Sequence, residues 1–191
     1  MTTLTTVTDF HGNPISGPPS AIGRYDAAVD HLLAYRNELV PAMTSLVDDE
    51  PDFPMGLVLA TYLTLTSTDA PDLPDAADLS ARLASVPVNE REAAHRGAIS
   101  SWLAGDWHRT ARQLDELLVR WPADLLGLLV GHQLDFFLGD AGNLRDRVAR
   151  SLSSVDPSHP HHGYVRGMFA FGLEESGHYG MAEDHGLAAV E

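Results

Sequence analysis

Apolar residues recur along most of the chain at the spacing of amphipathic helices. After Gly105, for example, apolar side chains stand at positions i, i+4, i+7, i+10, i+11 and i+14 of one helical face, at Trp107, Ala111, Leu114, Leu117, Leu118 and Trp121. Such a stripe buries one face of a helix. Nowhere do apolar and polar residues alternate over a stretch long enough to require a strand. The pattern therefore predicts an all-α protein.

Prolines and glycines divide this helical pattern at a nearly constant period. Four prolines close apolar stretches at steps of 36, 35 and 35 residues, at Pro51, Pro87, Pro122 and Pro157. Glycines run in phase with them, 34 and 38 residues apart, at Gly105, Gly139 and Gly177. Glycine tolerates the positive φ of a tight turn and proline ends a helix, so each unit is predicted to be two helices joined at a glycine. A period of this length is typical of stacked antiparallel helix pairs.

The predicted layout is an extended arm over residues 1–20 and a helical-repeat domain over 21–191. We expect about five helix pairs, at roughly 22–50, 52–86, 88–122, 123–157 and 160–191. Asn89 and Glu92 have the spacing of a capping box at a helix start. The last helix is still amphipathic at Glu191, where the next closing proline has not been reached. We therefore expect the domain to continue beyond residue 191, or this face to join a second copy in a homo-oligomer, with a frayed final helix on a small domain as the alternative.

The net charge of the chain limits the kinds of molecule that it is expected to bind. The chain has 27 acidic residues against 12 basic ones, all Arg, for a net charge of -15. An acidic surface disfavours binding to nucleic acid and to anionic lipid, because both present phosphates to the protein. No apolar run approaches the roughly 18 to 20 residues that span a bilayer, and the first residues lack the basic and apolar regions of a secretory signal. We expect a cytoplasmic protein that binds neither membranes nor nucleic acid.

Several catalytic classes are excluded within these residues. The chain contains no Cys and no Lys. A disulfide, a thiolate metal site, a phosphate-binding loop of the Walker type and a Schiff-base mechanism are therefore ruled out. The glycine-rich dinucleotide-binding motif and the nucleophile-elbow motif do not occur either.

Longer strings of the sequence resemble a known family. They are DFPMG (Asp52–Gly56), NEREAAH (Asn89–His95), GHQLDFFLG (Gly131–Gly139) and YVRGMFAFGLE (Tyr164–Glu174), continued by Tyr179, Ala182 and Glu183. The units resemble tetratricopeptide repeats, and these strings are more closely similar to the tetratricopeptide repeat protein 38 family. The resemblance covers roughly residues 22–191. It implies a tetratricopeptide-like α-solenoid, a right-handed superhelix around a deep inner groove, and it does not imply a particular reaction.

Four residues are candidates for a site in that groove. In tetratricopeptide stacking the first helix of each pair lines the concave side, so His95 and His132 are expected to face one cavity. Asp135 follows His132 by three residues and shares its helical face. The three side chains can hold a divalent metal or form a base oriented by a carboxylate. The structural alternative for the two histidines is that their imidazoles bridge neighbouring helices. The fourth candidate, Trp102, can contact a ligand, and its alternative is packing in the core.

A second histidine cluster is the string His159-Pro-His-His162. It lies between two predicted pairs and can capture a transition metal, with a flexible solvated loop as the alternative.

Two classes of function remain. The first is a scaffold that binds a protein or peptide partner in its concave groove, needs no cofactor, and prefers basic partners because it is acidic. The second is an enzyme or a small-molecule or metal-binding protein whose pocket contains His95, His132 and Asp135.

Overall fold

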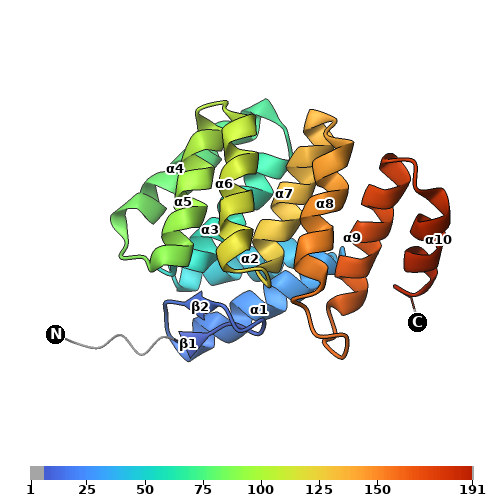
Figure 1. Ribbon diagram of the computed structural model, residues 1–191. Coiled ribbons are helices and arrows are strands. Elements are labelled where there is room, and N and C mark those ends of the chain that lie inside the picture. The colour runs from blue at the N-terminus through green and yellow to red at the C-terminus, as the bar shows by residue number, and fades with distance from the viewer. Residues whose placement is uncertain (1–6, 191) are drawn as a thin grey trace. The chain divides into compact units, whose positions relative to one another are not determined.

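The computed structural model describes residues 7–190, and over these residues the chain is all-α apart from one small hairpin (Figure 1). The prediction of an all-α protein is confirmed. The described residues form ten α-helices: α1 (Pro19–Leu33), α2 (Leu39–Asp49), α3 (Pro54–Thr66), α4 (Leu73–Ser85), α5 (Glu90–Leu103), α6 (Trp107–Arg120), α7 (Leu125–Leu138), α8 (Ala141–Leu152), α9 (His162–Glu175) and α10 (Tyr179–Leu187). A short 3-10 turn, Ala70–Asp72, precedes α4. None of these helices is long and apolar enough to cross a membrane.

The turns fall where the glycine and proline pattern predicts them. Gly105, Gly139 and Gly177 separate α5 from α6, α7 from α8, and α9 from α10, and they have positive φ values of 78°, 68° and 81°. A side chain at such a backbone angle is strained, so the turns require glycine. The four periodic prolines lie in the other connections, those before α3, α5, α7 and α9.

The chain forms two compact units. The first ends at Asp106 and the second begins at Trp107. Within each unit, every helix packs against the helix that follows it in sequence, from α1 to α5 in unit 1 and from α6 to α10 in unit 2. Such neighbour-on-neighbour packing is the arrangement that helical repeats use to bury a continuous core.

Unit 1 begins with a hairpin of two short strands, β1 (Val7–Thr8) and β2 (Pro14–Ile15), which pair antiparallel with Val7 opposite Ile15. It lies in the segment predicted as an extended arm, of which residues 1–6 fall outside the described residues. Strands of two residues are too short to produce an alternating sequence pattern, which is why the sequence did not predict them.

The hairpin is tied to the first turn of α5. Arg91 forms an ion pair with Asp9 at 2.9 Å, and both side chains are 1% exposed. The predicted capping box is confirmed: the Asn89 side chain accepts a hydrogen bond from the Glu92 backbone N–H, and Glu92 accepts one from the Asn89 backbone N–H. The second carboxylate oxygen of Glu92 accepts a hydrogen bond from the Ser16 backbone N–H at 2.7 Å, so one side chain caps the helix and also binds the hairpin.

In unit 2 the helices α8 and α9 approach each other very closely at Gly172. A Cβ atom placed on Gly172 would lie 2.7 Å from the Arg145 Cα atom and from the Leu144 carbonyl oxygen. The absence of a side chain at this position therefore sets the distance between the two helices.

Candidate functional site

In unit 1, two of the predicted site residues pack around one tyrosine of α3. His95 is fully buried, and its Nδ1 lies 3.2 Å from the Tyr62 hydroxyl oxygen. The Tyr62 hydroxyl also lies within hydrogen-bonding distance of the His95 carbonyl oxygen, at 3.4 Å. The Trp102 ring is buried with its centroid 6.4 Å from that of Tyr62. His95 thus links α5 to α3, in the manner of the helix-bridging alternative.

In unit 2, Asp135 of α7 is bound by an arginine of α8. Arg147 donates from Nε and Nη2 to the two Asp135 oxygens at 2.7 and 2.9 Å. Gly131 makes room for the guanidinium, because a Cβ atom there would lie 3.0 Å from the Arg147 Cδ and Nε atoms. Burial raises the pKa of the Asp135 carboxyl, and the hydrogen bonds from Arg147 oppose that rise. Both oxygens of this carboxylate are therefore engaged by the protein itself.

His132 lies one turn earlier on α7, and its ring faces a different element. The side chain is 8% exposed, and its ring centroid is 5.8 Å from that of Phe171 on α9. Among the described residues, its Nε2 atom has no hydrogen-bond partner. Burial lowers the pKa of His132 to about 4, with the nearby Arg147 charge acting in the same direction and a hydrogen bond to the Met168 backbone acting against it. His132 is therefore neutral near pH 7, and it forms no hydrogen bond with Asp135.

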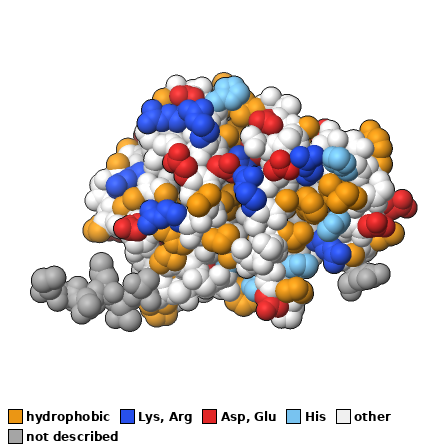
Figure 2. All heavy atoms as spheres, in the orientation of Figure 1, with side chains coloured by type: hydrophobic (Ala, Val, Ile, Leu, Met, Phe, Trp, Pro, Cys, Tyr) orange, Lys and Arg blue, Asp and Glu red, His pale blue; other side chains and the backbone are white. Residues whose placement is uncertain are grey.

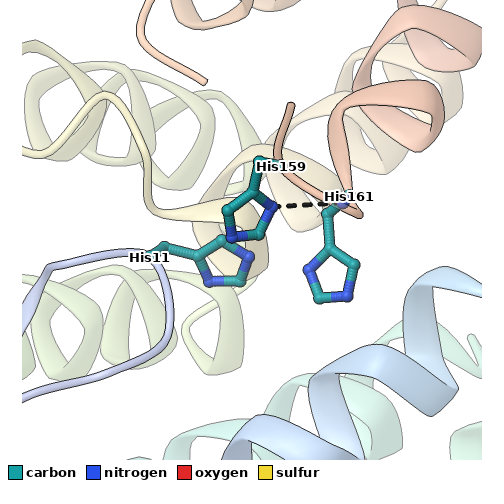
Figure 3. Close-up of side chains that lie close together, drawn as sticks. All are labelled: His11, His159 and His161. Carbon is teal, nitrogen blue, oxygen red and sulfur yellow. Dashed lines mark hydrogen bonds between the residues drawn. The ribbon is translucent and has the colours of Figure 1, made fainter. Parts of the chain in front are cut away.

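The histidine string between α8 and α9 forms a compact loop. The His161 backbone N–H donates to the His159 Nδ1 atom at 3.1 Å, the bond drawn as a dashed line in Figure 3. The two rings meet edge to face with their centroids 5.2 Å apart. His159 and His161 thus place two imidazole rings, whose nitrogens are common transition-metal ligands, close together in one loop.

A shallow furrow lies between α9 and α10. Its volume is about 420 Å³, and its lining is Ala170, Phe171 and Glu174 of α9 with Tyr179, Ala182 and Glu183 of α10. The Phe171 and Tyr179 side chains are 37% and 70% exposed, although both are large aromatic residues. Phe136 of α7, also exposed, continues the aromatic surface, with its ring centroid 5.7 Å from that of Phe171.

Carboxylates border this aromatic surface. Glu174 and Glu183 line the furrow, one from each helix, and no Arg or His lines it. Acidic side chains are visible beside apolar ones over α10 in Figure 2. The furrow therefore combines apolar contact area with negative charge, the chemistry that suits a cation attached to an apolar group.

The sequence alone did not predict a site at the furrow residues. Glu174 and Glu183 look like ordinary solvent-facing acids when each is considered on its own helix. The sequence does contain a spacing that could have indicated the furrow. Before the Gly177 turn, Phe171 and Glu174 are three residues apart on one helix. After it, Tyr179 and Glu183 are four residues apart on the next helix. Each pair occupies one helical face, so a hairpin can place both pairs along the same furrow.

No protein-family model matches the chain, and no solved structure matches it.

Proposed function

We propose that the chain is a tetratricopeptide-like α-solenoid, of the kind found in the tetratricopeptide repeat protein 38 family, that binds a basic and apolar segment of a partner protein. The observation that carries the proposal is the furrow between α9 and α10, with its exposed aromatic surface and its two bordering carboxylates. Stacked helix pairs commonly present extended binding surfaces of this type.

The aromatic residues supply the apolar part of the binding energy. Phe171 and Tyr179 are 37% and 70% exposed, and covering a large apolar side chain contributes on the order of 1.5 to 3 kcal/mol. The furrow is open, which suits a polypeptide segment lying along the two helices rather than an enclosed small molecule.

The carboxylates supply the preference for a basic segment. Glu174 and Glu183 attract a Lys or Arg side chain that lies beside the aromatic rings, and the net charge of -15 speeds the approach of a basic partner. Surface charges of this kind are screened by salt, so we expect binding to weaken as the ionic strength rises.

The alternative site of His95, His132 and Asp135 has less support. Asp135 already shares both oxygens with Arg147, and His95 is hydrogen-bonded to Tyr62. A divalent metal would have to displace a buried guanidinium to reach the carboxylate, which is costly in a low-dielectric interior.

Fluorescence anisotropy with two labelled peptides tests the proposal. The peptides share the same Leu and Phe residues and differ only in carrying Lys or Glu at the remaining positions. We expect saturable binding of the Lys peptide alone. Replacing Phe171 with Ser, or Glu174 and Glu183 together with Gln, should weaken it about tenfold, the loss of about 1.4 kcal/mol expected for a central contact.

A matched variant controls for net charge. Glu38→Gln combined with Glu116→Gln removes two exposed carboxylates outside the furrow. It should bind the Lys peptide like the wild type. Equal binding of the two peptides, or equal weakening in the control and in the furrow variant, would show that the furrow is not the binding site.

A further inference from the structure

Unit 1 contains a second hollow, distinct from the furrow of unit 2. It has a volume of about 310 Å³ and is formed by three connections: the one from β2 to α1, the one from α2 to α3, and the one from α4 to α5. These segments are brought together by the packing of the hairpin and helices within unit 1.

The floor of the hollow is the Phe53 ring, which is held in a fixed position. Phe53 is 3% exposed, and its ring meets that of Tyr25 edge to face with a centroid distance of 6.2 Å. Glycines adjoin it on both sides, since a Cβ atom on Gly17 would lie 2.6 Å from the Phe53 Cδ2 atom, and one on Gly56 would lie 3.0 Å from Cδ1. Gly17 also has a φ of 144°, which other residues rarely adopt.

The walls of the hollow are proline rings. Four prolines line it: one from each connection, Pro18, Pro51 and Pro87, and the first residue of α3, Pro54. Proline rings are rigid and carry no backbone N–H. The walls can therefore hold an apolar stem, and they offer no backbone donors to an anion.

The polar edge of the hollow is negative. Glu50 and Asp52 line it, and among the described residues neither carboxylate has a hydrogen-bond or ion-pair partner. Arg82 of α4 donates to the backbone oxygens of Val47 and Pro51, at 3.4 and 3.2 Å. No Arg or His lines the hollow.

We propose that this hollow binds a primary alkylammonium group carried on an apolar stem. The ammonium donates to Glu50 and Asp52, and the stem lies between the proline rings above Phe53. A free amine and a lysine side chain share this chemistry. The proposal does not depend on the function proposed for the furrow, because it rests on residues of unit 1 alone.

Titration of the full chain with hexylamine, followed by amide NMR, tests this site. We expect saturable shifts at the amides of Gly17 and Phe53. Hexanol, which has the same stem without charge, should bind about tenfold more weakly, because a hydrogen bond to a charged group is stronger than a neutral one. Hexanoate should not shift these amides. Equal affinity for the amine and the alcohol would overturn the proposal.

Two double variants distinguish the effect of the carboxylates in the hollow from the effect of the net charge of the protein. Glu50→Gln with Asp52→Asn should lower the affinity for hexylamine about tenfold. Glu38→Gln with Asp48→Asn removes two exposed carboxylates that do not line the hollow, and it should bind like the wild type. Similar weakening in both variants would also overturn the proposal.

The source of the ammonium is decided by a third probe. A short Leu-Lys-Leu peptide with blocked ends is compared with hexylamine. Tighter binding of the peptide at the Gly17 and Phe53 amides assigns the site to a lysine side chain, and tighter binding of hexylamine assigns it to a free amine. Shifts confined to Phe171 and Tyr179 would place the cation in the furrow and contradict this site while leaving the proposed function standing.

Discussion

Arg147 and Asp135 form a two-point ion pair inside unit 2, with Nε to Oδ2 and Nη2 to Oδ1 distances of 2.7 and 2.9 Å. Each side chain is 1% exposed. The remaining terminal nitrogen of Arg147 reaches Asp115 of α6 at 2.8 Å, so a single guanidinium joins three successive helices.

Removing the buried partner should therefore be costly. Asp135→Leu leaves the Arg147 charge buried without its main partner, and we expect the free energy of unfolding to fall by about 3 to 5 kcal/mol in urea denaturation. Replacing both residues, Asp135→Leu with Arg147→Met, should recover most of that loss. Asp115→Asn is the control, because Asp115 is 38% exposed and a pair at the surface contributes about 1 kcal/mol or less. Equal losses for Asp135→Leu and Asp115→Asn would contradict this account.

His132 should make the stability of unit 2 depend on pH. Burial lowers its pKa from 6.5 to about 4, so between these values the unfolded chain binds a proton that the folded chain does not. The contribution of His132 to stability is complete above pH 6.5 and is lost as the pH falls towards 4, by up to about 3 kcal/mol. In His132→Phe this loss is absent, which urea denaturation at several pH values measures as a difference from the wild type. Parallel pH profiles for the two proteins would show that His132 is not the responsible group.

Two glycines of α9 should respond oppositely to the same substitution. Gly172→Ala places a Cβ atom 2.7 Å from the Arg145 Cα atom, so α8 and α9 must separate, and we expect a loss of about 1 to 3 kcal/mol. Gly167→Ala meets no atom within 4 Å and should stabilise the helix by up to about 1 kcal/mol. Thermal unfolding of the two variants compares them directly, and a shift in the same direction for both would refute the close approach at Gly172.

The Asp9–Arg91 pair should hold the hairpin on α5. In Asp9→Asn the ion pair is lost, and the Asn13 backbone N–H loses the carboxylate that accepts its hydrogen bond at 2.9 Å. We expect faster hydrogen exchange at the amides of residues 9–13 and of Ile15, with the amides of α7 unchanged. Asp30→Asn, which removes an exposed pair with Arg36, is the control and should leave the hairpin protected. Wild-type exchange rates in Asp9→Asn would mean that other contacts hold the hairpin.

The sequence by itself determined the features that depend on near neighbours in the chain. The helices, the glycine turns with positive φ and the Asn89–Glu92 cap each follow from residues within a few positions of one another, because helix formation and capping are local. The candidate site was predicted less well. The spacing of His132 and Asp135 placed both on one face of α7, but spacing does not say what that face meets.

Only the tertiary structure decided the partners. Arg147 donates to both oxygens of Asp135, and the Tyr62 hydroxyl lies within hydrogen-bonding distance of His95. Arg91 forms an ion pair with Asp9, which belongs to a hairpin that the sequence did not predict. The furrow and the proline-walled hollow also exist only where separate segments meet. The physical reason is that a buried polar group pairs with whichever group the packing brings next to it, and a hollow forms where the packing leaves space. Both depend on contacts between distant parts of the chain, which the spacing of neighbouring residues does not predict.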